Sequence, residues 1–510
     1  MMDKSILKQV KEILESAYVC TRCILRFFCV KEYTSYISKT DIEKSIKLLV
    51  DEQSDDADET QISQEDSSND CPSAKRFSPN PCPSCLGILQ GVCDEMPSKL
   101  DDAVVKSQHK FKDFILQVSL PVVVDLRDRL FLLYLEEKLG DSYSLDEEEI
   151  PSVKDICKWV IGSQYGRLTN SDFTPDSDFQ ILISSVYPET IKECAVLFKS
   201  CPGAFPNARR KKVTEEEIYT KTAVLHAMEA LSTEMKKLYS LPPLPPDKCC
   251  TFNAIKCNHS PLYLGGRYNK YSRELSQTPW ILDGKRIMNS SVNELITDIV
   301  EKRILADKII FSASGREDVD VKMLGNGRPF VLELLNPRCL EWSDETIKAI
   351  EDEINKNSDI IAVRDLQVIS KMDTSLLKEG EEKKRKNYIA LCLVKKILSP
   401  EDVQKLQSLK DLKLEQKTPI RVLHRRTLAT RERLIHSMEA KIVSDHLLQL
   451  KIETQAGTYV KEFVHGDFGR TTPNLGTLLN TTADILELDV ENIHLEWPPK
   501  PNSDKNNKES

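Results

Sequence analysis

The sequence predicts an α+β protein with two principal domains: an N-terminal α/β accessory domain and a C-terminal domain with a mixed, mainly antiparallel sheet. Three observations lead to this fold class. The chain has 510 residues, more than one domain usually holds. Four prolines interrupt regular structure in LPPLPPDKC, residues 241–249. Strand and helix patterns alternate before this interruption, whereas strand patterns dominate after it.

Composition sets the predicted boundaries. Residues 51–80 are acidic, Ser-rich and almost without large apolar side chains, so we predict a disordered insertion there. The net charge is -9, and residues 51–70 hold nine acids and no base, so the rest of the chain sums to 0. The predicted regions are 1–105, a cysteine-containing region with the insertion; 106–240, the accessory domain; 241–250, a linker; 251–500, the C-terminal domain; and 501–510, a disordered tail.

The start of the chain and the cysteine content bear on location. MMDKSILKQVKEILESAYVC places apolar residues at helical spacing with acids among its lysines, which argues against a secretory signal and an Arg-rich transit peptide. No run approaches the roughly 18 to 20 apolar residues that cross a bilayer. Fifteen cysteines without a signal indicate a reducing compartment. We expect a protein of the nucleus and cytoplasm, with a mitochondrial pool as an alternative. We expect no membrane partner.

The elements before the linker alternate in type. FKDFILQVSLPVVV (111–124) and DFQILISSVY (178–187) have the composition of strands, and DICKWVIGSQYG (155–166) that of a helix. Residues 215–240 carry apolar side chains near one helical face and predict one long helix. These elements make the accessory domain α/β.

The elements after the linker are mostly strands. Residues 344–357 predict a helix among them. VDVKM, the turn signal GNG and RPFVLELL predict a β-hairpin over residues 319–335, with Asp318 where a loop enters it. The other strand candidates are KIIFSAS (308–314), NYIALCLV (387–394), PIRVLHRR (419–426), LLQLKIETQAGTYV (447–460) and NIHLEWP (492–498).

Two Cys-x-x-Cys pairs flank the acidic insertion, Cys20 with Cys23 and Cys82 with Cys85. Two such pairs can present four thiolates to one tetrahedral zinc ion and close a structural site. The long separation of the pairs costs little, because loop-closure entropy grows only logarithmically with length. Ordinary buried thiols or a redox pair are the alternatives, and Cys29, Cys71 and Cys93 are alternative ligands.

Three later segments carry side chains of catalytic type, although each alone has an ordinary explanation. Gly315 to Asp318 reads as a solvated turn, and Tyr388 as an aromatic residue of a strand edge. Lys461 reads as an exposed lysine after the glycine turn at Gly457. Their significance lies in the order in which they occur.

The ordered trio resembles the RNA pseudouridine synthases. Gly-Arg-Glu-Asp at 315–318, Lys-Asn-Tyr-Ile-Ala at 386–390 and Gly-Thr-Tyr-Val-Lys at 457–461 match the three motifs of those enzymes in type and order. A closer resemblance is to the archaeal and eukaryotic tRNA pseudouridine synthases with an N-terminal THUMP-containing domain. Four blocks carry it, at residues 265–280, 315–337, 418–433 and 457–476, and the paired cysteines fit the same family.

This resemblance implies an isomerase that converts uridine to pseudouridine with no catalytic cofactor, because substrate and product are isomers. It implies that Asp318 attacks C1′, acts as a base that gives a glycal, or attacks C6. Lys461 then pairs with Asp318, and a neighbouring cation favours an ionised carboxylate. Tyr388 stacks on the uracil, and Arg316 supports the flipped-out base.

The resemblance also implies a tRNA partner, read at its acceptor end by the accessory domain and modified in the T-arm at uridine 54, with uridine 55 as an alternative. Basic and aromatic side chains suit RNA recognition. We expect a monomer, with other structured RNAs as further candidates. The expected RNA contacts are Arg267, Lys270 and Arg273 in GGRYNKYSR, and Arg421, Arg425 and Arg426 in RVLHRR.

Two other functions are alternatives to the isomerase. A non-catalytic RNA-binding adaptor with a zinc module accounts for the cysteines and the basic blocks, but leaves the ordered trio without a purpose. A THUMP-bearing methyltransferase needs a glycine-rich cofactor loop between a strand and a helix. The glycines at 265–266, 325–327 and 466–476 do not form that pattern.

Overall fold

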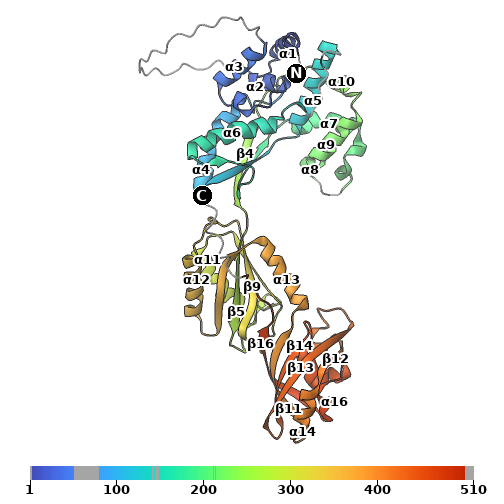
Figure 1. The fold of residues 1–510 in the computed structure, drawn as a ribbon. Helices are drawn as coiled ribbons and strands as arrows, with labels where there is room; N and C mark the ends of the chain where they lie inside the picture. The colour runs from blue at the N-terminus through green and yellow to red at the C-terminus, as the bar shows by residue number, and fades with distance from the viewer. Residues whose placement is uncertain are drawn as a thin grey trace. The chain divides into compact units, whose positions relative to one another are not determined.

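The computed structural model describes residues 3–50, 80–140, 143, 149–210, 212 and 214–499 (Figure 1). Of the predicted insertion only residue 80 lies within these ranges, and the predicted tail lies outside them. The chain forms two compact units that divide between Asn258 and His259. Within the described part of the chain, no helix combines the length and apolar character needed to cross a bilayer.

A four-stranded sheet organises the first unit, in the order β2-β1-β3-β4. β1 is parallel to both β2 and β3, and α5 and α6 lie between β1 and β3 in the sequence. The strands are β1 (Asp113–Ser119), β2 (Asp172–Phe173), β3 (Phe179–Val186) and β4 (Thr251–His259). The helices are α1 (Lys4–Ser16), α2 (Thr21–Phe27), α3 (Lys39–Val50), α4 (Met96–Ser107), α5 (Val123–Leu139), α6 (Val153–Thr169), α7 (Thr190–Ser200), α8 (Glu215–Ile218), α9 (Lys221–Ala230) and α10 (Met235–Leu238).

Two predicted elements of this unit differ from the structure. The predicted helix over 215–240 is three short helices. The backbone leaves the helical path at Thr220, with φ -64° and ψ 152°, and the Thr220 side chain caps α9 by accepting a hydrogen bond from the Ala223 N–H. The predicted strand over 111–124 ends at Ser119, and α5 starts at Val123. Pro121 suits that helix start, since it lacks only an N–H that the first turn does not use.

One hydrophobic core runs through the first unit. It joins Leu14 and Phe27 of the cysteine-containing region to Phe114 and Ile181 of the sheet. β4 completes this sheet, so residues 251–258 lie in the first unit, whereas the sequence assigned them to the second domain.

A ten-stranded sheet organises the second unit, in the order β10-β5-β9-β16-β11-β14-β13-β12-β15, with β8 also paired to β9. Only the pair β9 and β16 is parallel among its described pairs, which confirms the predicted mixed, mainly antiparallel sheet. The strands are β5 (Leu262–Lys270), β8 (Lys308–Ala313), β9 (Lys322–Leu335), β10 (Ile361–Ile369), β11 (Lys386–Val394), β12 (Lys410–Lys417), β13 (Thr430–Ser444), β14 (Leu447–Thr454), β15 (Thr471–Thr472) and β16 (Ala483–Ile493).

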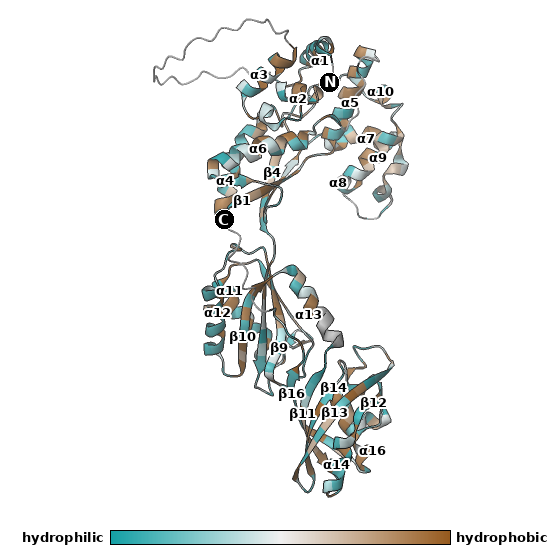
Figure 2. Cartoon of the chain, viewed as in Figure 1, coloured by the Kyte–Doolittle hydropathy of each residue, from teal (hydrophilic) through white to brown (hydrophobic). Residues whose placement is uncertain are grey.

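Helices cover both faces of this sheet. The buried isoleucines of α11 and α12 pack with Phe330 and Leu332 of β9, while Leu377 of α13 packs with Val331 and Trp497 on the other face. Figure 2 shows that the visible side of α12 is largely hydrophilic, as expected for a helix with one buried stripe. The helices are α11 (Val292–Arg303), α12 (Asp344–Asn357), α13 (Lys371–Lys383), α14 (Pro400–Ser408), α15 (Val460–His465) and α16 (Leu475–Leu479); β6 (Ile281–Leu282) and β7 (Lys285–Arg286) form a separate ribbon.

The predicted hairpin at 319–335 is wrong, because this segment is one strand, β9, with a bulge at the GNG sequence. Residues on both sides of the bulge pair with the same neighbour, Met323 with Lys270 and Arg328 with Tyr268. Gly325 has φ +55°, and a Cβ built there would lie 2.0 Å from a backbone oxygen of β16. Only glycine fits such a place.

Two predicted strands near the C-terminal motifs also differ. Residues 419–426 form a 3₁₀ turn over Ile420–Val422 and an exposed loop, not a strand. The strand predicted over 447–460 ends at Thr454, and a turn through Gly457, which has φ +76°, leads into α15. Lys461 therefore projects from the first turn of a helix, and the 3₁₀ turn lies close enough for Arg421 to reach Glu462 on that helix.

Candidate active site

A cleft of about 1250 Å³ in the second unit brings the three predicted motifs together. Asp318, Tyr388 and Lys461 all line it, although they come from the loop after β8, from β11 and from α15. Its lining is strongly basic, with two acids, Glu317 and Asp318. The basic lining residues are Arg316, Arg328, Lys386, Arg421, Arg425, Arg426, Arg433 and Lys461. Such a surface attracts a polyanion.

Asp318 lies between two cations. Its Oδ2 is 3.0 Å from Nη1 of Arg421 and 3.4 Å from Nζ of Lys461. The predicted neighbour of Asp318, Lys461, is therefore in place, but it also contacts Asp320 at 2.8 Å. Burial alone would raise the pKa of Asp320, yet the Lys461 ammonium holds it below its usual value. The sequence analysis did not identify Asp320 as a partner of Lys461.

A buried ion pair of Glu317 with Arg328 supports the loop that carries Asp318. Glu317 is 5% exposed, and its carboxylate accepts hydrogen bonds from Arg328 Nε at 2.6 Å and from the Tyr268 hydroxyl at 2.8 Å. Arg328 also donates to the carbonyl of Ser314 at 2.7 Å. Glu317, to which the sequence analysis assigns no role, is thus a fixed anchor of the loop that carries Asp318.

Gln277 completes this support. Its side-chain amide donates to the Tyr268 hydroxyl at 2.8 Å and to the carbonyl of Gly315 at 2.9 Å. Burial, followed by the charge of Glu317, raises the pKa of Tyr268, so its hydroxyl remains a donor at neutral pH. The loop that carries Asp318 is therefore held at two successive carbonyls, of Ser314 and Gly315.

Lys270 is fully buried, so the prediction that it contacts RNA is wrong. Its ammonium donates to the carbonyls of Val319 at 2.7 Å, Leu275 at 2.9 Å and Asp318 at 3.2 Å. Burial lowers its pKa to about 8, against the attraction of the nearby acids. Lys270 thus fixes the backbone of the loop at the carbonyls of Asp318 and Val319.

The other two predicted contacts in this block are also wrong. Arg267 is 4% exposed and donates to the carbonyls of Asn326 at 2.6 Å and Gly327 at 2.8 Å, so it stabilises the bulge of β9. Burial lowers its pKa to about 10. Arg273 pairs with Asp489 at 2.7 Å and Glu487 at 2.8 Å on β16. Neither guanidinium is free for a phosphate.

Replacing Lys270 with Met is expected to remove a pH dependence of stability. A lysine with a pKa of about 8 when folded and 10.5 when unfolded binds its proton more tightly in the unfolded chain. The free energy of unfolding therefore rises between pH 8 and pH 10.5, by up to about 3 kcal/mol for this shift. Urea unfolding at pH 7.5 and 10 would show this rise in the wild type and in an exposed control, Lys285→Met, but not in Lys270→Met. Equal pH dependence in all three proteins would contradict it.

The remaining predicted residues lie at the cleft as expected from their motifs. Tyr388 is partly buried on β11, and burial raises the pKa of its hydroxyl, which stays protonated at neutral pH. Arg316 is exposed and lines the cleft beside Asp318. Arg425 and Arg426 are exposed on the loop after the 3₁₀ turn and line the same cleft. These side chains are accessible to a bound polyanion.

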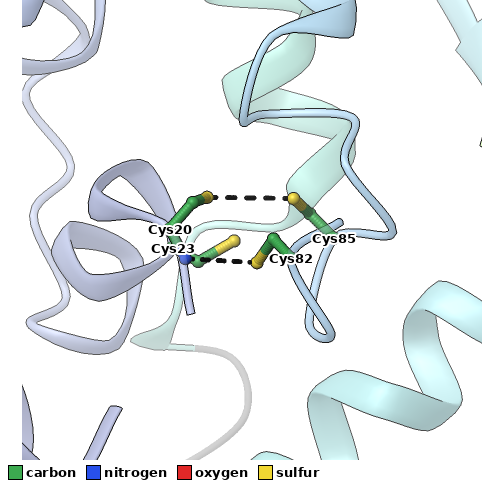
Figure 3. A group of neighbouring side chains, drawn as sticks. All are labelled: Cys20, Cys23, Cys82 and Cys85. Carbon is green, nitrogen blue, oxygen red and sulfur yellow. Dashed lines mark hydrogen bonds between the residues drawn. The ribbon is translucent and has the colours of Figure 1, made fainter. Parts of the chain in front are cut away.

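The first unit holds a separate candidate metal site. The sulfur atoms of Cys20, Cys23, Cys82 and Cys85 all lie within 4.8 Å of one another (Figure 3). Backbone N–H groups support them, from Cys20 to Cys82 Sγ at 3.3 Å and from Leu89 to Cys85 Sγ at 3.3 Å. Four thiolates around one centre, three of them buried, fit a closed structural site for a soft divalent metal ion.

The alternative ligands do not join this cluster. Cys93 lies 3.3 Å from Cys157 and is directed to that thiol, Cys29 is not part of the four-cysteine group, and Cys71 lies outside the described residues. An arginine supports the cluster from the interior. Nη1 of Arg26 is 3.7 Å from Cys23 Sγ and 3.2 Å from Asp128 on α5. The metal site is thus joined to the helices of the accessory region.

Two family models match the chain, "Eukaryotic Pus10, N-terminal" over residues 82–257 and "Pus10, C-terminal" over residues 263–494. The tRNA pseudouridine synthase Pus10 of Xenopus laevis is 40% identical over 96% of this chain and 98% of its own length, and that of Homo sapiens is 39% identical over the same shares. The archaeal Pus10 of Thermofilum pendens is 37% identical over 47% of this chain and 54% of its own.

Solved structures are more distant. A Cbf5-Nop10-Gar1 complex aligns with 45% of this chain and 48% of its own at 16% identity and a TM-score of 0.26. A pseudouridylate synthase aligns with 46% of this chain and 63% of its own at 11% identity and a TM-score of 0.18. Likeness at this level does not by itself indicate a shared function.

Proposed function

The chain belongs to the Pus10 family of tRNA pseudouridine synthases, and we propose that it uses Asp318 to isomerise uridine in the T-arm of tRNA. One observation carries this proposal: Asp318, Tyr388 and Lys461 meet in a single basic cleft. The adaptor function offers no reason for this convergence, because binding alone does not need an ion-paired carboxylate beside an aromatic ring.

The reaction breaks the bond from N1 to C1′, rotates the uracil and joins C5 to C1′, and the C5 proton is exchanged for one on N1. Asp318 acts by one of three routes: attack on C1′, proton abstraction that gives a glycal, or attack on C6. In the first route the carboxylate displaces uracil as an anion and is displaced in turn by C5 of the rotated base. Every route needs an ionised carboxylate held still, which the two cations and the fixed loop favour.

Tyr388 supplies the face on which the flipped uracil stacks. Its protonated hydroxyl can also donate to the departing or returning base. Extruding a base costs roughly a few kcal/mol, and phosphate contacts must offset that cost. Arg316, Arg425 and Arg426 are exposed beside the cleft and suit those contacts. The cleft volume exceeds the roughly 300 to 1000 Å³ of small-molecule sites and suits a nucleotide with its flanking backbone.

Zinc is the metal that we propose for the four cysteines of the first unit. Its role there is structural, because all four positions of a tetrahedral site are filled by protein sulfur. The proposed task of this unit is to hold the acceptor end of tRNA, so that uridine 54, or uridine 55, reaches the cleft. The family resemblance supports this division of labour, and the THUMP assignment of residues 106–240 belongs to the same proposal.

A product assay on tRNA tests the function. The purified chain is incubated with a tRNA transcript, and pseudouridine is mapped by carbodiimide modification and reverse transcription. We expect pseudouridine at position 54, position 55 or both, and its loss from transcripts with cytidine at those positions. Pseudouridine at another position would support the isomerase activity but contradict the T-arm as its target. Binding without any pseudouridine would favour the adaptor.

A further inference from the structure

The buried neighbour of Arg421 points to a role for this arginine inside the reaction centre. We propose that Arg421 is a catalytic residue that holds the Asp318 carboxylate, and that Glu462 is the positioning residue that fixes Arg421. The inference rests on the proposed function and adds two residues to the same site. The sequence analysis had assigned Arg421 to phosphate contacts, together with Arg425 and Arg426.

Glu462 fixes Arg421 from the interior of the unit. Glu462 is 1% exposed and lies in the first turn of α15. Its Oε1 accepts a hydrogen bond from Nε of Arg421 at 2.7 Å, and its Oε2 is buried with no hydrogen-bond partner among the described residues. A buried carboxylate needs a cation to compensate for its lost hydration. Nε of the guanidinium is therefore held by a carboxylate of the protein interior, although the Arg421 side chain is 39% exposed and lines the cleft.

The other end of the guanidinium is directed to the nucleophile. Nη1 of Arg421 donates to Asp318 Oδ2 at 3.0 Å, closer than Nζ of Lys461 at 3.4 Å. Lys461 is shared, since it lies 2.8 Å from Asp320. Arg421 is thus the nearer of the two cations on Asp318, and its planar fork reaches Glu462 through Nε and Asp318 through Nη1.

The charged groups around Asp318 come from several elements. Arg421 and Lys461 contact its carboxylate, Lys270 donates to its carbonyl, and Arg316 and Arg328 line the same cleft; the neighbouring acids are Glu317, Asp320 and Glu462. Burial alone would lower the pKa of Arg421, but Glu462 and Asp318 raise it, so the guanidinium stays charged throughout an ordinary pH profile.

This geometry assigns different tasks to the two oxygens of Asp318. Arg421 and Lys461 both contact Oδ2, and Oδ1 has no hydrogen bond to any described residue. Oδ1 is therefore the oxygen available to C1′ or to a substrate proton, while Oδ2 is held. When C5 displaces the carboxylate from C1′, Arg421 stabilises the negative charge that returns to it.

Arg421→Ala tests the first half of the proposal. With enzyme saturating over tRNA, the single-turnover rate should fall roughly 100-fold while the dissociation constant for tRNA changes little. Added guanidinium ion should restore part of the rate. Weaker tRNA binding with an unchanged saturated rate is the signature of a phosphate contact and would overturn the proposal.

Glu462→Gln tests the second half. It should lower the saturated single-turnover rate with little change in tRNA binding, and this effect should not add to that of Arg421→Ala in the double variant, because Glu462 acts through Arg421. A lower melting temperature with an unchanged single-turnover rate would overturn this role and leave Glu462 a structural residue. Arg421→Ala alone leaves the buried Glu462 carboxylate without a cation. The double variant has no such charge, so it can be assayed if Arg421→Ala does not fold.

A control pair and the wild type separate the possible failures. Arg303 on α11 donates to Glu353 at 2.7 Å outside the cleft, and Arg303→Ala should leave the rate and tRNA binding unchanged. A wild type that yields no pseudouridine would contradict the proposed function. An active wild type whose single-turnover rate is unaffected by Arg421→Ala would contradict this inference alone.

Discussion

Asp318→Ala is expected to abolish pseudouridine formation while leaving tRNA binding within a few-fold of wild type. No other acid of the cleft can replace it, since Glu317 is buried and paired with Arg328. Losing a nucleophile from a preorganised site lowers the rate by roughly 10⁴-fold or more. The backbone contacts of the loop, from Lys270, Gln277 and Arg328, do not involve the Asp318 side chain and should keep the fold.

The measurement is single-turnover conversion of a tRNA transcript, with binding followed by filter retention. Asp307→Ala is a matched control, because it removes another carboxylate of the same unit, one paired with Arg338 at 2.6 Å outside the cleft. It should convert tRNA at the wild-type rate. Retained activity in Asp318→Ala would sink the assignment of the nucleophile. Loss of binding together with activity would indicate a folding defect.

Sequence motifs could predict the three cleft residues because each motif is local. Asp318, Tyr388 and Lys461 were recognised from short segments in a fixed order, and the cleft brings those segments together. The partners of these residues could not be predicted in this way. Arg421 reaches Asp318 from a distant loop, and only the folded chain places Glu462 beneath it.

The bulge in β9 shows why the hairpin was predicted wrongly. A period-two pattern on both sides of Gly-Asn-Gly fits a hairpin and a bulged strand equally well. The choice depends on the pairing partner, and that partner is β5, far away in the sequence. Gly325 and Gly327 are a sequence signal for the bulge, because other backbone segments pass so close to both positions that a residue with a Cβ would clash.

The predicted RNA contacts in GGRYNKYSR failed for a related reason. Arginine and lysine are almost always exposed, so a basic block beside tyrosines suggests a nucleic-acid surface. β5, however, lies between β10 and β9. Arg267 donates its hydrogen bonds to backbone carbonyls at the bulge, and Lys270 donates to carbonyls of the loop that carries Asp318. The charges of this block serve the architecture of the site and not its contact with RNA.

Removing the metal is expected to unfold the first unit and leave the second unit folded. Structural zinc contributes about 10 to 16 kcal/mol of apparent binding free energy in zinc-finger peptides at neutral pH. Here Cys20→Ser with Cys82→Ser should lose the bound zinc, measured by elemental analysis of the purified chain. Thermal unfolding should show the transition of the first unit lowered, with that of the second unit unchanged. Cys249→Ser, an exposed thiol outside the cluster, should keep both zinc and stability.

The whole unit should respond because the cluster is not a separate module. Cys23, Cys82 and Cys85 belong to the same hydrophobic core as the strands β1 and β3. Arg26, which is 1% exposed, joins the cluster to Asp128 on α5, and Ser84 donates to that carboxylate at 3.0 Å. Without thiolate charge beside it, Arg26 loses part of what compensates its burial. Unchanged zinc content in the double serine variant would refute the site, whereas zinc loss without a shift of the first transition would show a metal that the core does not need.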